Sequence, residues 1–185
     1  MEGRIAALAR AHTILSLSSW EGAEPSRLID EELAPFITKD ARRGIAVSPK
    51  VCLEPSTAQT LALALHELAT NAAKYGALSS LSGWIKVSWE LSPDCLKLEW
   101  KENAGPHVQT PLSQGFGTRS VIVSIETQLG GCASFDWRPE GLCCRLSVPV
   151  PEMSERAGNE AAAKPEPDGE AVLAAGPRVR DRAPN

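Results

Sequence analysis

The clearest hydrophobic periodicity in the chain lies between residues 56 and 76, in the sequence STAQTLALALHELATNAAKYG. Apolar residues recur there every three or four positions, at Leu61, Leu65, Leu68 and Ala72. This spacing predicts an amphipathic helix whose apolar face packs on a core. We expect the helix to begin with a capping box formed by Ser56 and Gln59. We expect it to end at Gly76, in the left-handed conformation that glycine tolerates.

A second face of this predicted helix is polar. Glu67, Asn71 and Lys74 follow one another at intervals of about one turn, so their side chains lie on one side. Such a face is often only solvated. Here the run is rich in alanine and stops at Tyr75 and Gly76, and we therefore favour a polar face that lines a site.

Apolar and polar residues alternate in the second half of the chain, as they do in half-buried strands. Residues 84–90 and 96–100 alternate on either side of a turn, and residues 133–138 and 142–148 form a second such pair. The pattern predicts two β-hairpins. Strands in hairpins with helices between them are typical of an α+β two-layer sandwich.

Three further helices are expected. The first covers residues 4–18, and its apolar side is formed by Ile5, Leu8, His12 and Leu15. We interpret His12 as a residue packed on that side. Pro25 suits the first turn of a short second helix, in which Leu28, Ile29 and Leu33 are apolar. The third is expected over residues 118–129 and is ended by Gly130 and Gly131.

Two short β-prone runs precede the central helix, at residues 45–47 and 51–53, with a turn at Ser48 and Pro49. From residue 151 onward Ala, Glu, Pro, Gly and Arg dominate and periodicity is lost. This composition predicts a disordered tail. We therefore divide the chain into residues 1–36, a folded domain over residues 37–150, and the tail over residues 151–185.

Charge and composition exclude several function classes. The net charge is −4 and the isoelectric point is near 5.5, which argues against nucleic acid as a general partner. No apolar run has membrane-spanning length. The five cysteines form no C-x-x-C motif, and we expect reduced thiols in a cytoplasmic protein.

One zinc motif is begun but not completed. His66 and Glu67 start the pattern H-E-x-x-H, but its fifth position is Thr70. Only His12 and His107 remain as further histidines. Because a zinc hydrolase needs two histidines at this spacing and a third ligand, we reject that function.

The segment HELATNAAKYGALS resembles the N box of the HWE family of sensor histidine kinases, within the superfamily that includes gyrase and heat-shock chaperones. The family is named for a histidine in this box and a W-x-E in the next. They are matched by His66 and by Trp100 and Glu102. A glycine box follows at residues 115–119, and the resemblance covers residues 4–149. It implies the Bergerat fold, a two-layer sandwich with a mixed, mostly antiparallel sheet.

The resemblance also implies a site for ATP and Mg²⁺. Glu67 and His66 match positions that we interpret as catalytic, and Asn71 matches the Mg²⁺ ligand. The ATP-binding residues that it implies are Asn71, Lys74, Tyr75, Glu102, Gly105, Gly115, Gly117, Thr118 and Arg119. Glu102 stands where most of the superfamily has an aspartate that accepts from the adenine amino group. The family pattern continues E-x-G-G-P, but here Ala104 replaces the first glycine, at a cost if the backbone needs a positive φ.

The family carries its phosphoacceptor in a segment of the type H-R-x-K-N, which does not occur in this sequence. By resemblance, residues 1–36 are the end of a dimerisation helix and a linker. We therefore expect the acceptor histidine to come from a dimerisation hairpin, in trans or upstream, with a response regulator as an indirect partner.

The resulting prediction is the ATP-binding catalytic domain of a histidine kinase, which transfers the γ-phosphate to a histidine outside this chain. Two alternatives stay open. One is a regulatory module that binds nucleotide without transferring phosphate. The other is a serine kinase of the anti-sigma-factor type, from the same superfamily.

Overall fold

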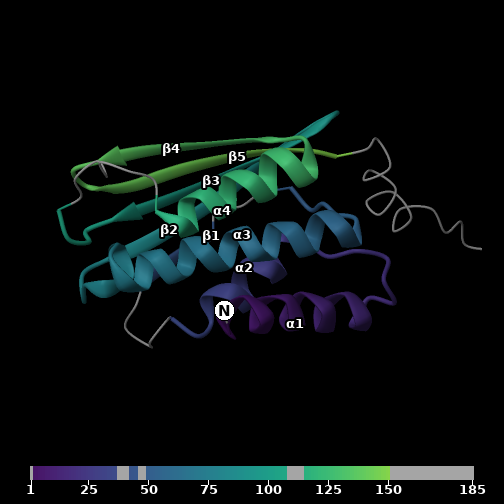
Figure 1. Ribbon diagram of the computed structural model, residues 1–185, viewed down its shortest axis with the longest axis horizontal. Coiled ribbons are helices and arrows are strands. Elements are labelled where there is room, and N and C mark those ends of the chain that lie inside the picture. The colour runs from purple at the N-terminus through teal and green to yellow at the C-terminus, as the bar shows by residue number, and fades with distance from the viewer. Residues whose placement is uncertain (1, 37–41, 46–48, 108–114, 151–185) are drawn as a thin grey trace, which may run out of the picture.

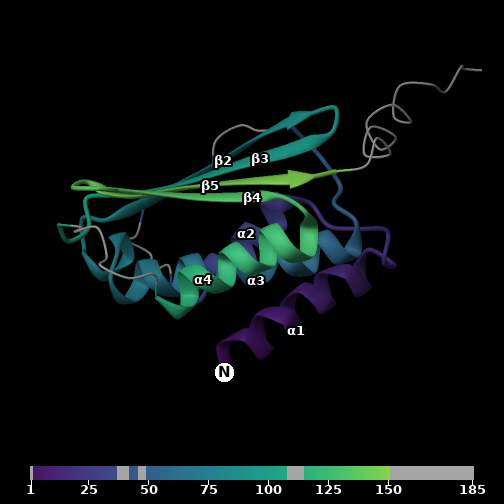
Figure 2. The ribbon, with the colours of Figure 1, turned by 45° about the horizontal axis from the view of Figure 1, so that its top comes forward.

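The computed structural model describes residues 2–36, 42–45, 49–107 and 115–150. These residues form two layers, with a sheet on one side and helices on the other (Figures 1 and 2). The helices are α1 (Glu2–Leu17), α2 (Pro25–Leu33), α3 (Pro55–Lys74) and α4 (Phe116–Val123), with a 3₁₀ turn at Ala77–Ser79. The strands are β1 (Arg42–Ile45), β2 (Trp84–Ser92), β3 (Cys95–Asn103), β4 (Cys132–Arg138) and β5 (Gly141–Pro149).

The sheet has the strand order β1-β2-β3-β5-β4. β1 runs parallel to β2, and all the other neighbours are antiparallel. Both predicted hairpins are confirmed as β2–β3 and β4–β5. The predicted fold class, an α+β sandwich with a mixed and mostly antiparallel sheet, is likewise confirmed.

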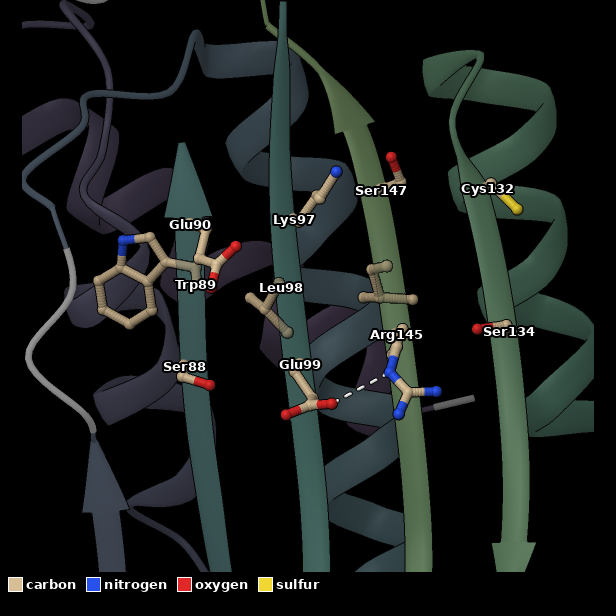
Figure 3. A pocket seen from close by; sticks show the side chains of 11 residues that line it. Ser88, Trp89, Glu90, Lys97, Leu98, Glu99, Cys132, Ser134, Arg145 and Ser147 are labelled. Atoms are coloured by element: carbon tan, nitrogen blue, oxygen red, sulfur yellow. Dashed lines mark hydrogen bonds and ion pairs between the residues drawn. The ribbon is translucent and has the colours of Figure 1, made fainter. Parts of the chain in front are cut away.

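The core lies between the sheet and α3, which crosses the middle of the helical layer (Figure 2). All four residues of the predicted apolar stripe of α3 are buried. They meet the inward residues of the strands, among them Ile85, Val87, Leu98 and Trp100. The opposite face of the sheet is polar, and there Arg145 on β5 pairs with Glu99 on β3 at 3.0 Å (Figure 3).

The ends of α3 differ from the prediction. The helix begins at Pro55, and Glu54 at its N-cap makes no side-chain capping bond, so the capping box at Ser56 and Gln59 is wrong. Gly76 has φ −112° and is not left-handed. A glycine is needed there for another reason, because a Cβ atom would lie 1.9 Å from the Oε2 atom of Glu102.

Helix α1 packs through a side that shares only Leu15 with the one predicted. Its buried residues are Ala7, Ala11, Ile14 and Leu15, and small alanines let α1 come close to its neighbours. Ile5 is 68% exposed and Leu8 is 43% exposed. His12 is exposed as well, with its ring edge-on to Trp20 at 4.6 Å. The prediction that His12 is packed on the apolar side is therefore wrong.

The last helix also begins earlier than predicted, at Phe116, and continues from Ser124 to Gln128 as a π-helical turn. Gly130 follows with φ +66°, so the predicted glycine stop is confirmed. Leu53 forms only an isolated bridge with Ala23 and no strand. Part of the first β-prone run and all of residues 151–185 lie outside the described residues.

The five cysteines are all free thiols, and they range from buried Cys143 and Cys144 to exposed Cys132. No helix within the described ranges is long and apolar enough to cross a membrane.

Candidate functional site

A cavity of about 620 Å³ opens beside the C-terminal half of α3, between the end of β3 and the beginning of α4. Most of the residues predicted to bind ATP line it: Asn71, Lys74, Tyr75, Glu102, Gly115, Gly117 and Thr118, together with Glu67. Segments far apart in the sequence therefore meet here. His66, Gly105 and Arg119 do not line this cavity.

The polar stripe of α3 forms one wall. Glu67, Asn71 and Lys74 all face the cavity, as one-turn spacing requires. Gly117 on α4 lies directly opposite, because a Cβ atom there would be 3.0 Å from the Oε2 atom of Glu67 and 3.1 Å from the Nδ2 atom of Asn71. Gly117 thus allows the first turn of α4 to approach α3 closely. A Cβ atom on Gly115 would meet nothing within 4 Å.

Glu102 is the second-last residue of β3, lines the cavity and is only 5% exposed. Its Oε2 atom accepts a hydrogen bond from the backbone N–H of Ala77 at 2.9 Å. Its Oε1 atom accepts one from the indole Nε1 of Trp100 at 3.2 Å. Burial raises the pKa of Glu102, and the two hydrogen bonds oppose that rise.

These bonds give a physical reason for the W-x-E spacing. Residues two apart on a strand point to the same face, so Trp100 and Glu102 both point toward the helical layer. The indole is an obligate donor and the ionised carboxylate an obligate acceptor. This hydrogen bond therefore satisfies the buried indole N–H of Trp100 and one buried carboxylate oxygen of Glu102.

The loop after Glu102 carries backbone strain. Ala104 has φ +56°, a conformation that favours glycine. This is the position at which the family pattern has glycine. Gly105 next to it is needed for close packing, because a Cβ atom there would lie 2.8 Å from the Cα atom of Ala77. Gly105 therefore supports the loop from behind rather than lining the cavity.

His66 lies on the other side of α3, where it faces α1 and α2. Its Nδ1 atom is 3.0 Å from the Oε2 atom of Glu32, a residue of α2 that is 1% exposed. Arg10 on α1 binds the same carboxylate through Nε at 3.0 Å. Burial acts to raise the pKa of Glu32, but the bonds from His66 and Arg10 outweigh it and lower this pKa. His66 thus joins three helices, and its placement does not support a catalytic role.

Several cavity residues were missed from the sequence: Thr70, Gly76, His107, Phe116, Trp137 and Leu142. Trp137 and Leu142 stand opposite each other in the register of β4 and β5. They give the cavity an apolar wall. The alternation of β5 already predicted Leu142 inward, whereas no motif marks Trp137. Arg119 lines a separate hollow beside α1, together with Arg4 and Ser120.

The chemistry of the cavity suits a nucleotide with a divalent cation. Mg²⁺ takes oxygen ligands, and proteins hold it through one or two side chains plus phosphate oxygens and water. Asn71 and Glu67 offer such oxygens side by side. Among the described residues no group of three or more His, Cys, Asp or Glu gathers to hold a metal without such help.

Comparisons with known proteins agree with this arrangement. The family described as HWE histidine kinase matches residues 1–49. A blue-light-activated histidine kinase of Rhizobium johnstonii is 36% identical over 151 residues, which cover 80% of this chain and 43% of that protein. A protein of the same name from Brucella anthropi is 32% identical over 151 residues, covering 80% of this chain and 31% of that protein. The chain thus spans less than half the length of these curated relatives.

Solved structures share the fold. The histidine kinase domain of the blue-light activated histidine kinase of Erythrobacter litoralis superposes with a TM-score of 0.65 at 16% identity, over 80% of this chain and 74% of that one. The ATP binding domain of PrrB from Mycobacterium tuberculosis gives 0.53 at 20% identity, over 70% and 96%. These likenesses show that the chain has the fold of histidine kinase catalytic domains, and the sequence matches relate it to the HWE histidine kinases.

Proposed function

We propose that this chain is an ATP-binding catalytic domain that transfers the γ-phosphate of ATP to a histidine outside the chain. One observation carries the proposal. A single cavity brings together the carboxylate and amide of α3, the buried carboxylate at the end of β3, and the beginning of α4. Each of these groups suits a different part of Mg²⁺-ATP.

The base of the nucleotide fits the end of the cavity at Glu102. Each carboxylate oxygen has two lone pairs, and among the residues that the structure describes each accepts one protein hydrogen bond. Glu102 therefore keeps the capacity to accept from the adenine amino group. Trp137 and Leu142 supply apolar surface for the flat base.

The phosphates fit the opposite end, between α3 and α4. Backbone N–H groups at the beginning of α4 suit anionic oxygens, and the ammonium group of Lys74 adds a positive charge. The amide oxygen of Asn71 would hold Mg²⁺, which would neutralise the phosphates, and the carboxylate of Glu67 beside it would order a water molecule bound to the metal. The predicted roles of Gly115 and Thr118 belong to this end, since both line the cavity.

The reaction would break the bond between the γ-phosphorus and its bridging oxygen and form a bond to an imidazole nitrogen of the acceptor, with ADP as the leaving group. Such transfers depend mainly on positioning and electrostatics. Glu67 is the carboxylate best placed to polarise the acceptor or to orient a water molecule. The acceptor would lie on a dimerisation hairpin, and a response regulator would take the phosphate afterwards in the cytoplasm.

Nucleotide binding is tested first. Millimolar ATP or ADP with Mg²⁺ should raise the melting temperature, because a ligand that binds only the native state stabilises it. Transfer is then tested with labelled ATP, alone and with a separately made HWE dimerisation hairpin. Label on the hairpin supports the proposed kinase.

Three outcomes would contradict the proposal. Binding with no label on any protein would favour a regulatory nucleotide-binding module. Acid-labile label on this chain, abolished by His12→Gln, would place the acceptor at His12, which is exposed on α1. Acid-stable label on a serine of an added protein substrate would indicate a serine kinase.

A further inference from the structure

One arginine of α1 joins the two helices that frame the cavity. The Nε atom of Arg4 lies 2.5 Å from the Oε1 atom of Glu67 on α3. Its Nη2 atom donates a hydrogen bond to the hydroxyl of Ser120 on α4. Its guanidinium carbon also lies 4.8 Å from the centre of the Phe116 ring, at the beginning of α4. A guanidinium is suited to these three contacts, because its donors form a fixed fork and its face stacks on aromatic rings.

The ion pair restricts the carboxylate that we expect to act on the acceptor. The side chains of Arg4 and Glu67 are 35% and 15% exposed, so the pair is partly shielded from water. Arg4 binds the Oε1 atom, whereas the Oε2 atom faces Gly117 on α4. Arg4 therefore fixes one oxygen of Glu67 and leaves the other directed toward the cavity.

The same arginine supports the beginning of α4. Gly115 at the N-cap of this helix makes no side-chain capping bond, and the Phe116 side chain is 76% exposed. The first residue of α4 therefore adds neither a capping bond nor a buried side chain, although Thr118 in the same turn is buried. The contacts of Arg4 with Phe116 and Ser120 provide a cross-helix restraint where the cavity wall begins.

A second arginine holds α1 in place without touching the cavity. Arg10 lies six residues further along α1, about 9 Å away at 1.5 Å per residue. It binds Glu32 on α2, which in turn contacts His66. The cluster of half-buried Arg10 with buried Glu32 and His66 thus docks the helix that carries Arg4.

We propose that Arg4 is a positioning residue of the nucleotide site, which orients Glu67 and orders the beginning of α4, so that α1 is part of the catalytic arrangement. This inference rests on the proposed function. The same contacts could instead hold Glu67 in an inhibited state. The test below distinguishes the two effects by the direction in which kcat changes.

The test compares Arg4→Gln with Arg4→Lys and with Arg27→Gln, a matched control on the exposed surface of α2. Hydrogen exchange is measured in the nucleotide-free protein. We expect the α4 amides of residues 119–123 to exchange about fivefold faster in Arg4→Gln, as loss of a local restraint should produce. Exchange in β3 and over residues 7–15 of α1 should stay unchanged, which separates the effect from fraying of α1. Arg4→Lys should be intermediate, and Arg27→Gln should match the wild type.

Transfer to the hairpin is measured on the same proteins. We expect kcat of Arg4→Gln to fall about tenfold or more, since misplacing a reacting group lowers the rate. KM for ATP should rise by a smaller factor, because the beginning of α4 also faces the phosphates. Unchanged α4 exchange, or an unchanged or increased kcat, would overturn the proposal, and an increase would identify Arg4 as an inhibitory restraint. A wild-type protein that binds no nucleotide would refute the proposed function itself. That failure is distinct, because exchange in α4 is measured without nucleotide.

Discussion

Ala104 offers a direct measurement of the strain in the loop that follows Glu102. Its φ of +56° places an L-amino acid in the left-handed region, where the Cβ atom crowds the following carbonyl oxygen. The loop is held in this conformation from both sides. The carbonyl oxygen of Ala104 accepts a hydrogen bond from the Ser82 hydroxyl at 3.2 Å, and Gly105 packs directly on Ala77. We expect Ala104→Gly to stabilise the protein.

The size of the effect follows from two opposing terms. Left-handed backbone costs an L residue about 1–2 kcal/mol, and glycine removes this cost. Glycine also gains freedom in the unfolded chain, which costs about 0.5–1 kcal/mol relative to alanine. The Ala104 methyl group is exposed, so its loss removes little buried surface. The difference is a gain of about 0.5–1 kcal/mol, equivalent to a rise in melting temperature of about 1–4 °C for a chain of this size.

Urea unfolding of the nucleotide-free protein measures this difference as a shift in midpoint at constant m value. Ala9→Gly is the matched control, because Ala9 is exposed in the middle of α1 and glycine there should cost about 1 kcal/mol. The two identical changes should therefore have opposite signs. Loss of stability in both proteins would refute the inference that Ala104 is strained.

Three further changes test other parts of the structure. Asn71→Ala should weaken Mg²⁺-dependent nucleotide binding without loss of helix, because alanine is the better helix former; unchanged affinity by titration would place the metal elsewhere. Glu102→Gln should lower the free energy of unfolding by about 1–3 kcal/mol, because its amide places a donor against the N–H of Ala77 or Trp100; it should also lower ATP affinity under conditions where the protein stays folded. The lowered pKa of Glu32 gives stability above the ordinary glutamate pKa of about 4.3 that is lost as pH falls through the folded-state pKa. Glu32→Gln should therefore have a flatter acid limb in urea midpoints measured against pH.

The sheet was predictable because its signal is local. Alternation along β2, β3 and β5 fixes which side chains point inward, and turn residues fix the hairpins. The ends of α3 were not predictable in the same way. Gly76 reads equally as a left-handed helix stop and as a site of close approach, and only the position of Glu102 distinguishes the two.

Helix α1 shows a different limit. Its sequence offers two apolar sides, one with larger residues such as Ile5 and Leu8, and one built on Ala7 and Ala11. Hydrophobicity alone favours the first. The structure uses the second, because alanines allow closer packing between helices, and that gain depends on the partner's surface. The exposure of His12 follows from this choice of side.

In the candidate site too, residues within sequence motifs were predictable, whereas residues brought in by tertiary packing were not. Residues in ordered boxes, such as Asn71 and Glu102, were predicted from the sequence to lie at one site, and both line the cavity. Trp137 could not, because it reaches the cavity through the pairing of β4 with β5 and stands in no motif. Gly105 was assigned to ATP for its place in a box, although its role in the structure is to let the loop pack on Ala77.

His66 and Glu67 are neighbours in the N box but serve different surfaces. Successive residues of a helix point about 100° apart, at 3.6 residues per turn, so the two side chains cannot share one wall. Glu67 faces the cavity, and His66 faces the buried carboxylate of Glu32 between α1 and α2. One turn of α3 therefore contacts both the proposed nucleotide and the helices that precede the domain. Arg4 and Arg10 both lie on α1, where Arg4 binds Glu67 and Arg10 binds Glu32, the partner of His66. A displacement of α1 must therefore disturb His66 and Glu67 together. The position of His66 is thus explained by its contact with Glu32, which helps to dock α1 and α2 on α3. We propose that the same docking positions the neighbouring carboxylate of Glu67.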